Sequence, residues 1–580
     1  MFSCRLPLSS INVSCAVRTL QQHISVADPR VVANGLLRSV RTMSSSSNHR
    51  STSPLFHYTS GRWVYNEDKR LKERERIFNV DQLQHLAARA VSRRREDVTS
   101  IEKLGEGAAN RAFVIRFRDG SQVVARIPYP VIEPKGLVVA SEAATMTFLR
   151  SKGIPVPQVL GYSCTADNPA GTEYIFMEFC SGRDLASLWD EMADEDCRRL
   201  VHHLVDVEAR LSALHLPASG SLYFLRDLPS KGNGVPIDTQ DTGKPDSLYI
   251  GSSTGLHFWF GKRSSQQVDR GPFSQPEAAM NAGAEKEAQY LEHYGRPLLP
   301  FNRFQRETFN FQKQLPSVHL DSLRKYLQIS KHLIPRSEGL KSSILRHPDL
   351  RPSNIFVSED FRITALIDWQ HSSALPMFLS AGIPEFLDNT GSQLPDESSE
   401  LPSNPSDEDE NTKAQRLYSL RQRGLRNTYI SAVEKHDPLH FEALTYPFAI
   451  GRQKIHRLSG DPWQGDNIPL RSSLIFVKQN WDQISSDPNT HCPISFTEEE
   501  EQECLRLDDA EQQGVEQLEE FRQAIGLGPE GWVSHDNYEG AKEAIARMKE
   551  MSLEQAETEE ERIAIRDHWI FDDFDENEYE

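Results

Sequence analysis

The sequence predicts an α+β protein with two lobes, a small β-rich first lobe and a larger helical second lobe. Residues 113–117 and 123–127 are alternating runs of β-branched and apolar residues around Asp119-Gly120, which is the pattern of a β-hairpin. The last third of the chain is mainly helical in composition. With 580 residues and 38% hydrophobic residues, the chain can build a substantial core.

The first 45 residues have the composition of a mitochondrial transit peptide. The stretch up to residue 60 is rich in Arg and Ser, and Asp28 is its only acidic residue. Its apolar residues are dispersed, whereas a secretory signal has one continuous apolar block. We therefore expect import into mitochondria, to the matrix, with cleavage near residues 41–44. An ordinary disordered leader is the alternative.

Charge and cysteine content narrow the class of partner. The formal net charge of −19 argues against broad nucleic-acid binding, because phosphate contacts require clustered Lys and Arg. No apolar run approaches the roughly 20 residues that a membrane span needs. The seven cysteines contain no CxxC pair, which favours free thiols and a reducing compartment. A nucleotide and a small molecule are the expected partners.

Residues 60–180 are expected to form the first lobe. Asp81 is a plausible N-cap for a short helix, since apolar residues follow it at helical spacing. After the hairpin, residues 140–150 are helical in composition and end before Gly153. Residues 173–179 predict another strand.

The second lobe is expected from residue 181 to residue 390, with an ordered insertion at 216–275 whose aromatic residues must pack. Residues 391–411 are rich in Ser, Pro, Asp and Glu and predict a disordered acidic loop. Residues 412–570 are expected to be the C-terminal helical part of this lobe, with a possible capping box formed by Thr497 and Glu500. We expect 571–580 to be a solvated acidic tail.

The strongest chemical signal is the segment from His347 to Asn354, HPDLRPSN, followed by Asp368 in IDW. It fits the kinase pattern H-x-D-L-x-x-x-N with a later metal-binding Asp. Asp349 can accept the proton of the attacking hydroxyl, while Asn354 and Asp368 can hold Mg²⁺ on nucleotide phosphates. Two short strands at 355–357 and 363–367 would bring Asn354 and Asp368 together. A turn whose Asp and Asn bond their own backbone is the alternative.

A second signal lies just before the hairpin. Gly105 and Gly107 would let backbone N–H groups approach a phosphate, although such a loop is often only a turn. Arg126 ends the hairpin, Glu142 lies in the following helix, and Glu178 ends the next strand. The order of glycine loop, hairpin, helix, strand and catalytic loop is that of a two-lobed kinase, and these five residues form the expected nucleotide-binding set.

These segments resemble a known family. LGEGAANR, VARIPYP, SEAATMTFLRSKGIPVPQV, YIFMEFCSGRDL, HPDLRPSNIFV and IDWQ are similar to the aminoglycoside phosphotransferase-like superfamily and, within it, to the fungal altered inheritance of mitochondria protein 9 family. The similarity covers about residues 60–550. It implies a protein-kinase-like fold with a helical second lobe, and a mitochondrial address. It does not imply an aminoglycoside substrate.

Several assignments stay open. Arg126 stands where kinases have Lys; it can pair with Glu142, but an exposed contact of little value is the alternative. Trp369-Gln370 replaces Phe-Gly after the metal-binding Asp. His347 can orient the catalytic loop or act as a base. The aromatics at 258–260, with Arg263 and Arg270, either line an acceptor pocket or pack the insertion.

The leading hypothesis is therefore an ATP- and Mg²⁺-dependent phosphotransferase that acts on the hydroxyl of a small molecule in mitochondria. The alternative is a catalytically weak kinase-fold protein that binds a nucleotide or a partner. Retention of Asp349, Asn354 and Asp368 favours the first, and Arg126 keeps the second open. Nucleotidyl transfer on the same fold is a third possibility.

Overall fold

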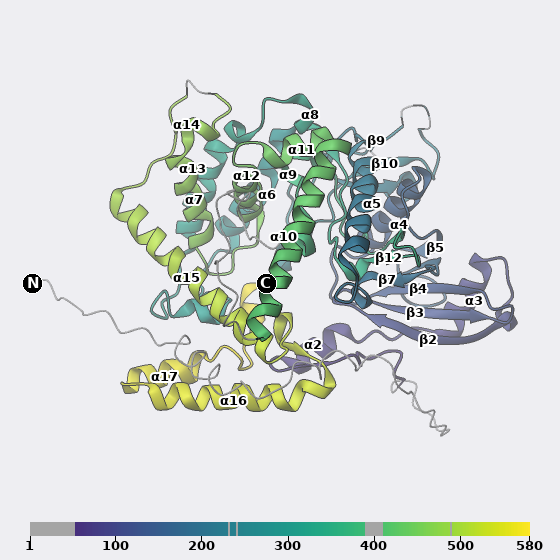
Figure 1. Cartoon of the computed structure of the whole chain (residues 1–580), viewed down its shortest axis with the longest axis horizontal. Coiled ribbons are helices and arrows are strands. Elements are labelled where there is room, and N and C mark those ends of the chain that lie inside the picture. The colour runs from purple at the N-terminus through teal and green to yellow at the C-terminus, as the bar shows by residue number, and fades with distance from the viewer. Residues whose placement is uncertain (1–52, 230–232, 239, 241, 389–409, 488–489) are drawn as a thin grey trace, which may run out of the picture.

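The computed structural model describes residues 53–229, 233–238, 240, 242–388, 410–487 and 490–580, and it confirms the two-lobed α+β fold (Figure 1). The small lobe is built on a five-stranded antiparallel sheet with the strand order β2-β3-β4-β6-β5. Its strands are β2 Val98–Glu106, β3 Asn110–Phe117, β4 Gln122–Pro128, β5 Val159–Ser163 and β6 Tyr174–Glu178. The predicted hairpin is formed by β3 and β4, in which Val114 lies opposite Val124.

One helix packs on each face of this sheet. Because side chains alternate along a strand, Val123 of β4 joins the cluster packed by α3 (Val80–Ala90), whereas Val124 joins the cluster that contains α4 (Leu137–Ser151). The N-cap of α3 is Asn79, whose side chain accepts from the Gln82 amide, and not Asp81. The N-cap lies two residues earlier than expected, so Asp81 is in the first turn of the helix.

The large lobe is mainly helical. Most of its helices lie to the left of the small lobe in Figure 1, while α5 and strands β9 (Val235–Pro236) and β10 (Leu248–Gly251) lie above the small-lobe sheet. Helix α10 packs along α5 next to the small lobe, while α6 packs against α7 and α12, and α13 against α15. The predicted Thr497–Glu500 capping box is present at the start of α15. The helices of this part are α5 Asp194–Ser212, α6 Pro276–Tyr294, α7 Pro316–Ile329, α8 Glu338–Lys341, α9 Met377–Ser380, α10 Glu410–His436, α11 Pro438–Thr445, α12 Ala449–Gly460, α13 Ile468–Gln479, α14 Trp481–Ile484, α15 Glu498–Ala524, α16 Tyr538–Gln555 and α17 Glu559–His568.

Two small sheets carry the insertion and the catalytic segment. In the insertion, β8 Ser221–Phe224, β10 Leu248–Gly251 and β9 Val235–Pro236 pair in that order. Phe258 is buried against α6, so this aromatic residue of the insertion packs into the protein. Strands β12 Ile355–Val357 and β13 Ile363–Leu366 form the hairpin expected between the catalytic loop and the metal-binding Asp, with β7 Arg183–Asp184 beside β12.

The C-terminal residues correct one expectation, since residues 571–580 are packed against the protein. Tyr579 is buried and its ring meets Phe301 edge-on at 5.1 Å. Glu576 accepts hydrogen bonds from Asn66 (2.7 Å) and Arg70 (2.6 Å). Composition alone predicted a solvated tail. The aromatic residues between the acidic ones instead pack against the protein, and Arg70 compensates the charge of Glu576.

The segment before the small lobe lies beside the C-terminal helices (Figure 1). Strand β1 (Arg62–Trp63) pairs with β15 (Trp532–Val533), and α2 (Glu67–Arg74) follows β1. The expected transit peptide, residues 1–45, and residues 391–409 of the expected acidic loop lie outside the described residues, and α10 begins at Glu410. Among the described helices, none combines the length and apolar character of a membrane span.

Candidate active site

The catalytic loop is held by His347. Its Nε2 lies 2.7 Å from the Ile367 carbonyl oxygen, and its Nδ1 accepts from the Asp349 amide at 3.1 Å. The ring also meets Trp369 edge-on, with centroids 4.6 Å apart. Burial lowers the pKa of His347, so the ring is neutral at physiological pH. Because both nitrogens engage the backbone, this geometry supports an orienting role for His347 and leaves Asp349 as the candidate base.

Asp349 is partly exposed and shares its carboxylate with two neighbours. Its Oδ2 accepts from Arg351 Nε at 2.7 Å and from Asn354 Nδ2 at 3.3 Å. Asn354 Nδ2 also donates to the Asp349 carbonyl oxygen at 2.8 Å. The local turn considered as an alternative is therefore present, and it places the two side chains together. Arg351 was missed by the sequence reasoning, although it lies inside the motif.

The hairpin brings Asp368, the expected metal ligand, to the same place. The Ile367 amide donates to the Asn354 carbonyl oxygen at 3.0 Å, directly before Asp368. Asp368 has a φ of 66°, the left-handed region that is uncommon for residues other than glycine. Such a conformation persists only where the surroundings fix it, and here it directs the carboxylate toward the small lobe.

Arg126 connects the two lobes through a buried network. Its Nη1 binds Glu142 Oε1, while its Nη2 binds Asp368 Oδ1 and donates to Gln370 Oε1 at 2.9 Å. Gln370 Oε1 also accepts from Asn110 Nδ2 at 3.1 Å. The planar guanidinium binds these partners through two different nitrogen atoms, whereas a lysine side chain has only one nitrogen. Sequence reasoning anticipated Glu142 as a partner but missed Gln370 and Asn110.

Burial determines the electrostatics of this network. Glu142 is only 3% exposed, so the contact is not the exposed pair considered from the sequence. Burial raises the pKa of Glu142 to about 7 against the opposing charge of Arg126. Burial also acts to raise the pKa of Asp368, but the charge and hydrogen bond of Arg126 hold it below its ordinary value. Asp368 is therefore ionised at neutral pH.

The donor set fits Mg²⁺ held partly by phosphates. The hydrogen bonds of the two side chains use Asn354 Nδ2 and Asp368 Oδ1, so Asn354 Oδ1 and Asp368 Oδ2 are the oxygens that can face a cation. Within the described ranges, no three His, Cys, Asp or Glu side chains gather into a metal site. Two protein oxygens suit Mg²⁺, which typically takes one or two of them and completes its shell with phosphates and water.

Glu106 of the glycine loop anchors that loop to the preceding segment. Its Oε2 accepts from the Thr59 amide at 2.7 Å and from Ser60 Oγ at 2.8 Å. Its Oε1 accepts from Lys103 Nζ and Arg111 Nε, both at 2.8 Å. The side chain is almost fully buried by these partners. The position of the loop thus depends on residues 57–60, which no local sequence signal indicated.

The two glycines of this loop are not required by packing within the protein. A Cβ at Gly105 would meet nothing within 4 Å, and one at Gly107 would meet only the Asn110 carbonyl oxygen at 3.6 Å. The Gly107 amide donates to that same oxygen at 2.9 Å, which closes a tight turn. The missing Cβ atoms leave the backbone accessible from the open side of the loop.

Other candidate residues lie apart from the network. The Glu178 carboxylate pairs with Arg150 at 2.9 Å, so its side chain does not join Arg126 and Asp368. Arg263 is buried and binds Glu287, and Arg270 donates to the carbonyl oxygens of Arg263 (2.7 Å) and Gln266 (3.1 Å). These contacts show a packing role for both arginines.

Two aromatics of the insertion do line a cavity. Trp259 and Phe260 border a volume of about 1340 Å³, whose lining also includes Glu106, Gly107 and Ala108 of the glycine loop. The exposed faces of the insertion and of the glycine loop therefore share one cavity. Its lining does not include Asp349, Asn354 or Asp368.

Comparisons with known proteins agree with this geometry. The phosphotransferase enzyme family, APH, matches residues 100–378, which include the glycine loop and the catalytic hairpin. A subtelomeric hrmA-associated cluster protein of Aspergillus fumigatus is 31% identical over 82% of this chain and 97% of its own length. Altered inheritance of mitochondria protein 9, mitochondrial, of Yarrowia lipolytica is 25% identical over 93% of each chain.

A solved structure described as a putative fructosamine-3-kinase from Thermobifida fusca is 14% identical, covers 74% of this chain and 100% of its own, and has a TM-score of 0.33. Two findings establish the family: the sequence identity extends along nearly the full length of the fungal relatives, and the phosphotransferase family match covers the site. The chain belongs to the aminoglycoside phosphotransferase-like family, in the group that contains the fungal altered inheritance of mitochondria protein 9.

Proposed function

We propose that the protein is an ATP- and Mg²⁺-dependent phosphotransferase that acts on the hydroxyl of a small molecule. One observation carries the proposal: Asn354 bonds Asp349 on one side, and its backbone bonds the residue before Asp368 on the other. A carboxylate for the acceptor and two oxygen ligands for the metal thereby converge on one loop and one hairpin.

In this mechanism Asp349 orients the acceptor hydroxyl and accepts its proton as the phosphoryl group is transferred. Its position is set by His347 through the backbone and by Asn354 through the side chain. Asn354 and Asp368 would hold Mg²⁺, which would neutralise negative charge on the nucleotide phosphates. Arg126, kept in place by Glu142, directs a guanidinium toward the phosphates.

Binding of the nucleotide requires an exchange of partners at Arg126. In the structure the Nη2 of Arg126 binds Asp368, a proposed metal ligand. A phosphate that takes this guanidinium would also release Asp368 Oδ1, so that both carboxylate oxygens would be open to the metal and phosphate and metal would favour each other. We therefore expect nucleotide and Mg²⁺ to enhance each other's binding.

The same contact favours a second candidate function. If Arg126 stays on Asp368, the protein is a kinase-fold nucleotide- or partner-binding protein with little catalysis. The two functions differ in whether phosphate is transferred.

The mitochondrial setting is also a proposal. Several relatives, including the protein from Yarrowia lipolytica, carry "mitochondrial" in their names. The Arg- and Ser-rich leader supports the same address, with the matrix as its expected destination.

A direct test incubates the protein with ATP, Mg²⁺ and a mitochondrial metabolite extract, and searches by mass for added phosphate or adenylate. Added phosphate supports the proposed reaction, whereas added adenylate means nucleotidyl transfer. For an acceptor found this way, Asp349→Asn should lower single-turnover transfer by about 10²–10⁴, as expected for a positioned acid or base, with little change in nucleotide affinity. Asp360→Asn, at the exposed turn of the same hairpin, is the matched control.

Equal transfer rates in wild type and Asp349→Asn would remove Asp349 from the mechanism. If ATP binds but no product forms with any fraction of the extract, the binding function is favoured.

A further inference from the structure

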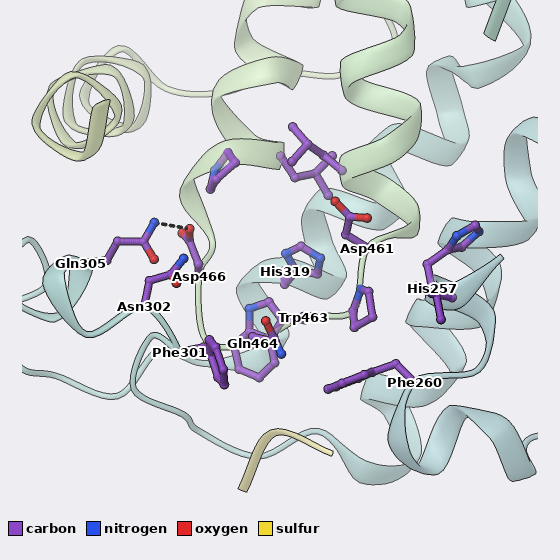
Figure 2. A pocket seen from close by; sticks show the side chains of 15 residues that line it. His257, Phe260, Phe301, Asn302, Gln305, His319, Asp461, Trp463, Gln464 and Asp466 are labelled. Carbon is purple, nitrogen blue, oxygen red and sulfur yellow. Dashed lines mark hydrogen bonds between the residues drawn. The ribbon is translucent and has the colours of Figure 1, made fainter. Parts of the chain in front are cut away.

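A second cavity, of about 460 Å³, lies within the helical lobe (Figure 2). Its wall combines the start of the 256–260 segment, residues 301–305, the first turns of α7, and the connection from α12 to α13. The proposed catalytic residues Asp349, Asn354 and Asp368 are not part of its lining. The volume falls within the range of roughly 300–1,000 Å³ that is typical of small-molecule sites.

His319 of α7 is the first sign that this cavity has a ligand. The side chain is 5% exposed and lines the cavity, yet neither ring nitrogen has a hydrogen-bond partner among the residues described. Burial lowers the pKa of His319 to about 4, so the neutral ring offers one donor and one acceptor. A buried polar group without a partner is costly, so a ligand that moves into hydrogen-bonding range of the ring from the cavity side would relieve this cost.

The charge of the lining is the second sign. The cavity is lined by Asp461 and Asp466 and by no Lys or Arg. Asp461 has a partner at the surface, Arg457, at 3.1 Å. Asp466 accepts only from neutral donors, the Gln305 amide (3.1 Å, dashed in Figure 2) and the Ile468 backbone (2.9 Å), and the described residues give it no basic partner.

The surroundings of Asp466 make its ionised carboxylate unfavourable unless a cation lies nearby. Burial raises the pKa of Asp466, and Asp508 on α15 raises it further. Asp466 in turn helps to raise the pKa of Glu511, a buried residue of the same helix, to about 9, and one Glu511 carboxyl oxygen lacks a partner among the residues described. A positive group at Asp466 would remove this repulsion.

The remaining lining is aromatic. Phe260, Phe301 and Trp463 border the cavity, and the Trp463 ring lies 6.3 Å from that of His319. Aromatic faces attract ammonium groups and also pack against an apolar ligand body.

We propose that this cavity binds a small molecule with a protonated amine, its ammonium group at Asp466, a hydrogen bond to His319, and its apolar part against the aromatic rings. An anion is excluded by the absence of basic lining residues. Water would satisfy the hydrogen bonds of His319 but would leave the charge of Asp466 uncompensated. A metal ion is disfavoured, since the described residues contain no suitable cluster of ligands. The site does not require that its ligand be phosphorylated, so it goes beyond the proposed transferase function.

The test uses three probes with one skeleton: benzylamine, benzyl alcohol and benzoate. Each is titrated with the full-length protein at neutral pH and followed by ligand-observed NMR. We expect saturable binding of benzylamine, binding of benzyl alcohol that is about tenfold weaker or less, and none of benzoate. Asp466→Asn should weaken benzylamine about tenfold, which is the effect of losing a charge-assisted hydrogen bond, and should leave benzyl alcohol unchanged.

Asp482→Asn is the matched control, because Asp482 is exposed on α14 and should affect no probe. Leu256→Trp is a second variant. Leu256 is a half-exposed residue of the lining, so a larger side chain should fill the cavity without disturbing the core and should abolish benzylamine binding.

The proposal is overturned if benzylamine does not bind saturably to the wild type, which would mean a cavity that holds water only. It is also overturned if benzylamine binds equally well to Asp466→Asn, or to Leu256→Trp where Asp466→Asn fails to fold. ATP binding measured in the same samples reports separately on the proposed transferase, so failure of one proposal does not count against the other.

Discussion

Replacing Arg126 by Met tests the buried network most severely. The change removes the guanidinium but keeps a long side chain, and it leaves Glu142 and Asp368 facing each other without a cation. Removing one partner of a buried ion pair typically costs about 3–5 kcal/mol, because the other charge stays buried. We expect a loss in the free energy of unfolding of that order at neutral pH.

The pH dependence makes this prediction specific. Glu142 in the wild type has a pKa of about 7, above its ordinary value, so the folded state binds a proton that the unfolded state releases. The free energy of unfolding therefore falls as the pH rises from the ordinary pKa of a glutamate to about 7, and it changes little at higher pH. Without Arg126 the pKa of Glu142 rises, and the fall continues above pH 7. The difference between wild type and Arg126→Met should grow by about 1 kcal/mol between pH 7 and pH 8, because the variant loses up to about 1.4 kcal/mol while the wild type loses the remainder of its own titration.

The assay is chemical denaturation at pH 6, 7 and 8, followed by tryptophan fluorescence, since Trp369 is buried beside the network. The set comprises the wild type, Arg126→Met, Glu142→Gln and the double variant. Glu142→Gln should remove the extra pH dependence and recover much of the stability lost in Arg126→Met. An Arg126→Met protein as stable as the wild type at pH 8, or additive effects in the double variant, would contradict the buried network.

Two further predictions concern other parts of the chain. Residues 1–60 fused to a fluorescent protein should be imported into mitochondria because of their Arg-rich, acid-poor composition, and a cytosolic signal would refute the transit peptide. Burial lowers the pKa of His440 to about 3, so between pH 6.5 and 4.5 the unfolded state gains a proton that the folded state does not. The wild type should therefore lose about 2–3 kcal/mol of unfolding free energy over this range, and His440→Gln should not show this loss in denaturant titrations. An unchanged acid profile in the variant would refute this.

The features that the sequence predicted correctly are those set by short stretches of chain. The β3–β4 hairpin follows from alternation around Asp119-Gly120, and the approach of Asn354 to Asp368 follows from two short strands with a polar turn. In both cases the residues involved are fewer than 20 positions apart. Local spacing therefore determines the geometry.

The contacts that the sequence did not predict join distant positions. Arg126 reaches Asp368 and Gln370, which are 242 and 244 residues away. Gln370 was visible as a departure from the kinase motif, and that departure was the available signal, but nothing local indicates that its amide bonds Asn110. His319 gave no signal, because a single histidine in a helix does not reveal its missing partners.

The C-terminal residues show why composition alone was misleading. Counting acids in 571–580 predicts a solvated tail, but Phe574 and Tyr579 recur among them and pack on Phe301. Glu576 then becomes the partner of Arg70, an arginine in a helix 500 residues earlier. An average over the segment hides the pattern that buries it.

The central claim, a nucleotide and Mg²⁺ site at Arg126, Asn354 and Asp368, is tested most directly by thermal unfolding with ATP alone and with ATP plus Mg²⁺. A ligand at 100 times its Kd stabilises the folded state by about 2.7 kcal/mol. We predict a larger rise in Tm with Mg²⁺ than without it, abolished in Asp368→Ala and retained in Asp360→Ala. No shift in the wild type at millimolar nucleotide, or an undiminished Mg²⁺-dependent shift in Asp368→Ala, would contradict the claim.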